Sequence, residues 1–192
     1  MKKKILFLIA MALLISVLTL SVSMRQERMS AQEVEELRTK YKVYGDINKV
    51  NPLIEVGVVK TTLKEIAKKS DTFVYGEVLE EVPVYSAKSY AKFYGYKIRV
   101  ISDTKNIFSS GEEITIIANT VFQEYFPVLS KGMKVVLPIG EIKGKYYFEL
   151  CAYYVTEDEF VISAFDEKEI LDKEYSGIKL EKLLNEIKKH SW

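Results

Sequence analysis

Apolar and polar residues alternate at every second position in much of this chain, and this pattern most constrains its fold. The alternation recurs in segments bounded by turn residues such as Ser110-Gly111 and Lys143-Gly144. Side chains alternate between the two faces of a strand, so this period predicts β-strands. The segments are Thr72–Leu79, Tyr94–Ser102, Glu113–Ala118, Met133–Ile139, Tyr146–Val155 and Phe160–Phe165.

The segment Thr120–Ser130 lacks alternation and predicts a short helix or turn between the third and fourth strands. Three strands, a crossing and two further strands follow the order of an OB-type barrel. Closure also removes the exposed edges that apolar strands would otherwise present. The expected fold class is mainly β. It is a small OB-like barrel of five to six strands, with a short helix before it, a C-terminal helix and an N-terminal signal or anchor helix.

Helix signals flank the strands. Ser30-x-x-Glu33 and Thr62-x-x-Glu65 are capping-box patterns, which predict a helix from about Ala31 to Tyr41 and a short helix ending near Ser70. A C-terminal helix is predicted from about Ile178 to His190. Its apolar stripe is Leu180, Leu183, Leu184 and Ile187.

The chain begins with Lys2, Lys3 and Lys4, and an apolar run from Ile5 to Val22 follows. A positive start before an apolar run is typical of an export signal or a membrane anchor. As a helix the run spans about 27 Å, slightly less than the ~30 Å of bilayer hydrocarbon. Ser21 and Ser23 suit cleavage after Ser23, so cleavage and retention both stay open. The predicted division is residues 1–23 as signal or anchor, 24–58 as a partly helical stalk, and 59–192 as the barrel domain.

Charge and rare residues exclude several function classes. Lys and Arg number 28 against 27 Asp and Glu, which is unlike a dedicated nucleic-acid binder. After Arg38 the chain has one arginine, Arg99, so bidentate phosphate capture is poorly supplied. One Cys and one His exclude an internal disulfide, a multi-cysteine zinc site and a multi-histidine metal site. No metal, cofactor or catalytic set is expected, and a non-enzymatic role is favoured.

Aromatic rings and lysines interleave between the first two strands. In OB barrels this loop borders the binding face, where rings stack on bases or sugars. In the alternative interpretation, Tyr94 and Tyr96 are barrel-wall residues and the lysines are solvated. The candidate binding residues are Tyr85, Lys88, Tyr90, Lys92, Phe93, Tyr94 and Lys97.

A second aromatic group precedes Pro127 and consists of Phe122, Tyr125 and Phe126. Their spacing of three and four places them on one helical face, which either packs into the core or docks a partner. Cys151 lies between apolar neighbours and is expected to be a buried small hydrophobe. Pairing of its thiol with His190 is the alternative.

Carboxylates gather at the predicted turns, at Glu112–Glu113, Glu157–Glu159 and Asp166–Glu167. A hydrolase needs two such groups held ~5–10 Å apart across a cleft. These residues therefore define an alternative hypothesis of an exported hydrolase.

The segment from Leu63 to about Lys189 resembles a poorly characterised group of exported small OB-like β-barrel proteins of Gram-positive bacteria. The motifs that carry the resemblance are Ser70–Val78, Tyr96–Val100, Ser110–Ile114, Leu129–Leu137 and the C-terminal Leu180–Ile187 helix. The chain departs from that group in lacking a lipid-anchor Cys and in having Phe122–Phe126 where a Gly-rich loop is typical. The resemblance implies the fold and export, and it carries no catalytic residues.

These observations lead to one expectation and two alternatives. The expectation is an extracytoplasmic protein, secreted or anchored through residues 5–22, that acts as a non-enzymatic binding module for a protein, peptide or glycan. Sequence-specific nucleic-acid binding is not expected. The alternatives are the hydrolase and an accessory subunit of a membrane complex, docking through Phe122–Phe126 or Tyr90–Tyr96.

Overall fold

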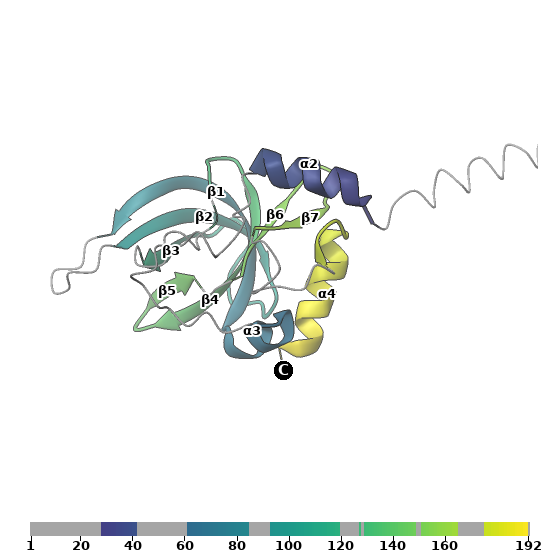
Figure 1. The fold of residues 1–192 in the computed structure, drawn as a ribbon. Helices are drawn as coiled ribbons and strands as arrows, with labels where there is room; N and C mark the ends of the chain where they lie inside the picture. The colour runs from purple at the N-terminus through teal and green to yellow at the C-terminus, as the bar shows by residue number, and fades with distance from the viewer. Residues whose placement is uncertain are drawn as a thin grey trace, which may run out of the picture.

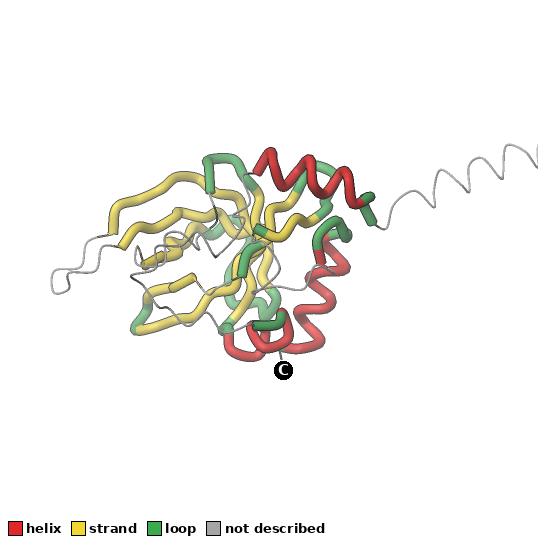
Figure 2. The backbone as a smooth tube through the Cα atoms, in the orientation of Figure 1, coloured by secondary structure: helices red, strands yellow, loops and turns green. Residues whose placement is uncertain are grey.

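The fold is mainly β, as predicted, with helices gathered on one side (Figures 1 and 2). The computed structural model describes residues 28–41, 61–84, 93–119, 127, 129–148, 151–164 and 175–191. The helices are α2 (Ala31–Tyr41), α3 (Leu63–Lys69) and α4 (Leu180–His190). The strands are β1 (Thr72–Val84), β2 (Phe93–Asp103), β3 (Glu113–Asn119), β4 (Lys134–Ile142), β5 (Lys145–Phe148), β6 (Tyr153–Val155) and β7 (Val161–Ser163).

Five strands close into a barrel. β1 pairs antiparallel with β2, and β2 pairs antiparallel with β3. β3 runs parallel to β5, β5 pairs antiparallel with β4, and β4 returns antiparallel to β1. A single row of paired residues crosses all five strands, through Val82, Gly95, Ile117, Tyr147 and Gly140. β6 and β7 extend the sheet from the first half of β4.

β1 has two parts with different partners. Thr72 and Phe73 pair with β4 alone, and residues Val74 to Glu77 pair with both β2 and β4. The register with β2 shifts between Tyr75 and Gly76, an irregularity of the kind that a glycine inside a strand often marks. β1 then continues to Val84, five residues beyond its predicted end. Its pairing with β4 stops at Glu77, but its pairing with β2 continues to Val84.

The segment Tyr146–Val155 was expected as one strand, and that prediction is wrong. Two strands, β5 and β6, pair with β4 in its place. Phe148 pairs with Ile139 of β4, and Tyr153 pairs with Val136. Tyr153 is thus five residues after Phe148, whereas their partners on β4 are three residues apart. The two extra residues interrupt the ladder, as at a bulge, and the chain leaves the barrel wall to form the β6–β7 extension.

The capping boxes are present at both predicted helix starts. The Ser30 and Thr62 amides donate to Glu33 and Glu65, and the Glu33 and Glu65 amides donate back to the two hydroxyls. α4 begins at Leu180, two residues later than predicted, because Ile178 and Lys179 form β-bridges with Arg28 and Phe160. Among the described residues, no helix is long and apolar enough to cross a membrane. The predicted N-terminal signal or anchor helix lies outside them.

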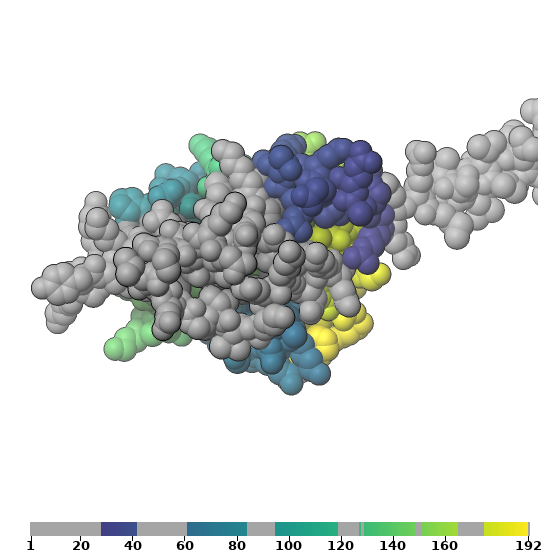
Figure 3. All heavy atoms as spheres, in the orientation of Figure 1, coloured from purple at the N-terminus to yellow at the C-terminus, as the bar shows by residue number. Residues whose placement is uncertain are grey.

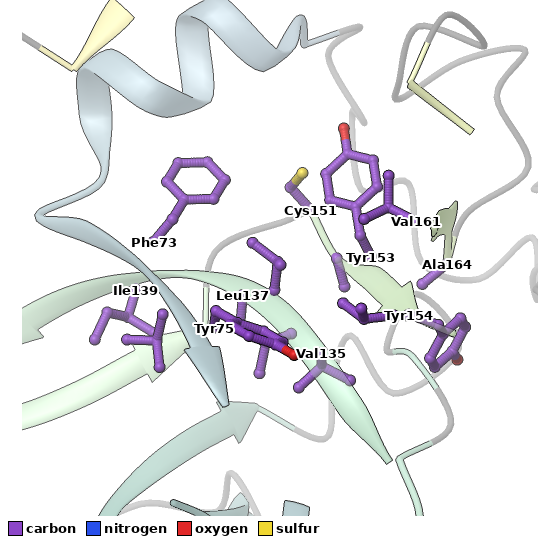
Figure 4. Close-up of a cluster of buried hydrophobic side chains, with 14 of the residues drawn as sticks. Phe73, Tyr75, Val135, Leu137, Ile139, Cys151, Tyr153, Tyr154, Val161 and Ala164 are labelled. Carbon is purple, nitrogen blue, oxygen red and sulfur yellow. The ribbon is translucent and has the colours of Figure 1, made fainter. Parts of the chain in front are cut away.

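The core joins the barrel to the helices. α3 buries Leu63, Ile66 and Ala67, and α4 buries Leu180, Leu183 and Ile187, as their stripes predicted. Figure 4 shows the centre of this cluster, where Phe73, Cys151 and Tyr153 lie together, each with at most 1% of its surface exposed. α3 and α4 are therefore part of the same hydrophobic core as the strands.

α2, the helix predicted within the stalk, packs on the domain. The ring of Tyr41 stacks on Tyr154 with centroids 4.8 Å apart. The Met29 amide donates to the Gly177 carbonyl at 2.7 Å. These contacts hold both ends of α2 against the β6–β7 side of the molecule.

Replacing Gly177 by alanine is expected to loosen α2. Gly177 has a φ of +79°, and an added Cβ would lie 2.7 Å from the Val34 Cγ2 and 3.2 Å from the Met29 Cβ. We expect a loss of about 2 kcal/mol in the free energy of unfolding, measured in urea, with faster amide exchange in α2. Gly132→Ala is the control, because its φ is +86° and nothing lies within 4 Å. Equal losses in both variants would show that contact with α2 adds no stability.

Candidate binding site

The β1–β2 hairpin forms an arm that extends beyond the closed part of the barrel. β4 pairs with β1 up to Glu77, and the last bonds on that side join Val78 to Met133 and Gly132. Glu80 to Val84 then pair with β2 alone within the described residues. Two glutamates and Pro83 occupy this edge, and both residue types discourage further strand pairing.

Two hairpins project toward the same side of the molecule. In Figure 1 the β1–β2 arm and the β4–β5 hairpin both point away from α4. The β4–β5 turn has Lys143 and Gly144 at φ values of 54° and 75°. Beside this turn lies Ile142, an exposed apolar side chain with 59% of its surface accessible. The outer face of β2, β3 and β5 lies between the two hairpins.

The middle of that outer face is apolar. Gly95, Ile117 and Tyr147 lie in one row and share the outer face, since directly paired residues project to the same side. The neighbouring row, Tyr96 and Ile116, is buried in the core. Gly95 and Ile117 are buried, and Ile117 is only 7% exposed, so the half-buried Tyr147 ring is the most accessible member of this row.

Ion pairs neutralise one end of this face. Glu77, Arg99 and Glu113 are directly paired across three strands. The Arg99 guanidinium lies 3.3 Å from Glu77 and 3.9 Å from Glu113, and the Lys97 ammonium lies 2.8 Å from Glu113. We call these four residues the charge ladder. Both of its cations are already paired with carboxylates.

The pKa values of the ladder follow from this pairing. The hydrogen bond and attraction from Glu113 raise the pKa of Lys97 above its ordinary value. The same contact with Lys97, helped by Arg99, lowers the pKa of Glu113. Each group is therefore held in its charged form, and Glu113 is a poor proton donor.

The structure places some of the sequence-predicted binding residues. Phe93 and Tyr94 begin β2, where their backbones pair with Val84 and Pro83 of the arm. Lys97 lies further along β2, in the charge ladder. Tyr85, Lys88, Tyr90 and Lys92 lie outside the described residues, in the segment that joins the ends of the arm. Phe122, Tyr125 and Phe126 also lie outside them.

Sequence reasoning missed Asp103, a carboxylate only 7% exposed at the end of β2. One oxygen accepts hydrogen bonds from the Thr72 hydroxyl at 2.9 Å and from the Lys105 and Ile107 amides at 3.0 Å. The other accepts from the Phe108 amide at 3.0 Å. These bonds make Asp103 the anchor of the loop between β2 and β3. Its signal in the sequence was an Asp followed by a turn, which is common in loops that need no such anchor.

Cys151 is fully buried, as predicted. Burial raises the pKa of its thiol far above the ordinary value, although a hydrogen bond with Tyr153 acts in the opposite direction. A nucleophilic cysteine needs the reverse, a thiolate stabilised near neutral pH. The site therefore supports packing for Cys151, and a thiolate couple with His190 has no support.

The described turn carboxylates have separate local partners. Glu112 accepts a hydrogen bond from the Ser109 amide at 2.9 Å, and Glu113 belongs to the charge ladder. Glu157, Asp158 and Glu159 are exposed at the β6–β7 turn. The hydrolase hypothesis required raised pKa values in a shared cleft, and the pKa of Glu113 is lowered. Asp166 and Glu167 lie outside the described residues.

In comparisons with known proteins, the chain matches no family model and no curated protein sequence. Within the described residues, no group of three or more His, Cys, Asp or Glu side chains is placed to hold a metal ion.

Proposed function

We propose that this protein is a membrane-tethered extracytoplasmic binding module built on an OB-type barrel. The observation that carries the proposal is the closed order β1-β2-β3-β5-β4, with parallel β3 and β5 and two hairpins flanking one face. OB barrels bind oligonucleotides and oligosaccharides on the face of their second and third strands, between the equivalent loops. The lysine-led apolar run at Ile5–Val22 supports the tether.

Charge decides between the two ligand classes. A protein that binds an oligonucleotide needs cations free to meet phosphates. Here Lys97 and Arg99, the cations of the outer face on β2, are paired with Glu113 and Glu77, and exposed Glu80 and Glu81 lie on the arm. Lys145 of β5 adds one exposed cation to this face. The half-buried Tyr147 ring beside it suits the flat face of a sugar ring. We therefore propose a neutral glycan as the ligand.

The aromatic residues of the arm are expected to carry this binding. Tyr90→Ala with Phe93→Ala removes two rings that stacking would use, and we expect at least a tenfold loss of affinity, or about 1.4 kcal/mol. The measurement is calorimetric titration of the full chain in lipid nanodiscs with a chito-oligosaccharide, alongside other neutral oligosaccharides and an oligothymidylate.

The control is Tyr175→Ala, which removes a half-buried ring that packs against the core five residues before α4. It should leave the affinity unchanged. Tight binding of the oligothymidylate, with weak binding of every neutral sugar, would contradict the proposed ligand class. A large fall in melting temperature of the double variant would show instead that the two rings belong to the core.

A further inference from the structure

The described charges are divided between the helices and the strands. Residues 61–69 and 175–191, which contain α3 and α4, have seven lysines against three glutamates. The strand-bearing segments 70–84, 93–119, 129–148 and 151–164 have seven cations against eleven carboxylates. The α3–α4 surface is thus basic and the strand-bearing segments are acidic, although Glu157 to Glu159 adjoin the start of α4. Residues 28–41, which contain α2, are balanced, with three cations against three carboxylates.

The lysines of α3 and α4 lie on one continuous surface, which we call the helical lysine face. α3 packs against α4, and the two adjoin at the lower right of Figure 3. An open hollow of about 930 Å³ lies along α4, and it is lined by Lys179, Lys182, Lys188 and Lys189 together with Asn185, Glu181 and Glu186. Glu186 and Lys189 form an ion pair that cancels both charges, whereas Glu65 keeps its charge in the capping box with Thr62. The exposed lysines of this face are Lys64, Lys68, Lys69, Lys182, Lys188 and Lys189.

The chain enters the described domain beside this face. Arg28 forms a β-bridge with Ile178, immediately before α4, and the Met29 amide bonds to Gly177. Five residues separate Arg28 from Val22, the last residue of the apolar run. Fully extended, they reach at most about 18 Å. A domain of this length is about 35 Å across, so the tether holds the Arg28 side toward the bilayer.

We infer that the helical lysine face lies on anionic lipid headgroups of the membrane that holds the apolar run. This inference rests on the proposed function, in which residues 5–22 remain in the bilayer. Two independent observations indicate that the same side of the molecule lies on the membrane. They are the basic charge of the α3–α4 surface and the short tether that ends beside α4. Each lysine close to an anionic surface strengthens binding about fivefold. Lys189 is paired with Glu186, so the lysines of this face that act on the lipid are Lys64, Lys68, Lys69, Lys182 and Lys188. The acidic barrel side and the β1–β2 arm then point away from the lipid, toward a ligand.

The orientation is tested by energy transfer from the protein to the lipid. The full chain is reconstituted in vesicles of phosphatidylcholine and phosphatidylglycerol at three to one, with an acceptor dye on the headgroups. A donor dye is attached at Asn185→Cys on α4 or at Ile142→Cys on the β4–β5 hairpin, and the buried Cys151 stays unlabelled. We expect transfer from residue 185 to exceed transfer from residue 142, because α4 lies against the headgroups and the β4–β5 hairpin points away from α4 (Figure 1).

Two further arms test the charge. Lys182→Glu with Lys188→Glu should abolish most of the difference between the two positions, as should vesicles of phosphatidylcholine alone. The matched control Lys131→Glu with Lys134→Glu reverses two exposed charges outside the helical face and should change nothing. Equal transfer from both positions, greater transfer from residue 142, or a difference unaffected by lipid charge would each overturn the inference. The glycan titration is independent of these readouts, so a failure of ligand binding is distinguished from a failure of orientation.

Discussion

Replacing Gly76 by valine is expected to cost the domain about 4 kcal/mol of its unfolding free energy, and alanine about 3 kcal/mol. A Cβ at this position would lie 2.5 Å from the Ile98 Cγ2 and 2.7 Å from the Arg99 carbonyl oxygen. The Ile98 methyl group can shift, but the carbonyl oxygen is fixed in the β1–β2 ladder. Relief therefore requires β1 to move, and Gly76 also pairs with Val135 of β4, so the movement opens the barrel.

A double-mutant cycle separates the two collisions. Ile98→Ala removes the methyl contact and leaves the carbonyl in place, so it should recover about 1 kcal/mol of the Gly76→Ala loss. Urea denaturation followed by circular dichroism provides the four free energies. The control Thr115→Val adds apolar bulk at an exposed position of β3 and should change stability by less than about 0.5 kcal/mol. A Gly76→Ala loss as small as that of the control would contradict the close approach of β1 and β2.

The elements that the sequence predicted well are those with local causes. The capping boxes at Ser30 and Thr62 place helix starts within a few residues, because donor and acceptor lie on the same turn. Alternation placed β1, β2, β3 and β4, because each of these strands has one face in the core.

What the sequence could not predict depends on partners distant in the chain. The break between β5 and β6 comes from a mismatch of two residues against β4, and no signal within Tyr146–Val155 marks it. The length of β1 is set by how far β2 continues, past the point where alternation fades at Glu80 and Glu81.

The charge ladder is the clearest example at the candidate site. Lys97 was predicted as a cation free for a ligand, and Glu113 as a turn carboxylate. Their pairing follows from the β2–β3 register, and that of Glu77 with Arg99 also depends on the two register shifts in β1. The four residues of the charge ladder are distant in the sequence, so they could not be placed together without knowledge of those registers. Once placed, they favour a neutral sugar among the protein, peptide and glycan ligands that the sequence left open.

Removal of the Asp103 carboxylate is the second large effect that we expect. Asp103→Ala leaves three backbone amides and the Thr72 hydroxyl without their acceptor, in a loop that also ties β2 to β1. A hydrogen bond to a charged group contributes ~1.5–3 kcal/mol, and partial access to water reduces the sum to about 4 kcal/mol of unfolding free energy. Asp103→Asn keeps the shape and one acceptor oxygen, so its cost is about 2 kcal/mol at neutral pH.

The pH dependence of this cost gives the stricter test. Burial alone would raise the pKa of Asp103, but the four hydrogen bonds outweigh it and hold the pKa below its ordinary value. The folded protein therefore keeps the proton off Asp103 where the unfolded chain has begun to bind it. The stability from Asp103 is complete above the unfolded pKa of about 3.9 and is lost as the pH falls through the lower, folded pKa.

Asparagine does not titrate, so the stability difference between wild type and Asp103→Asn should be constant at neutral pH and shrink below about pH 4. The lowered pKa values of Glu65, Glu113 and Glu186 also make the domain sensitive to acid, but they act equally in both proteins and cancel in the difference. Asp158→Asn, at an exposed turn position, is the matched control and should give a difference near zero at every pH. A wild-type advantage over Asp103→Asn that persists unchanged into acid would mean that the loop is held by shape, and that the charge of Asp103 contributes nothing.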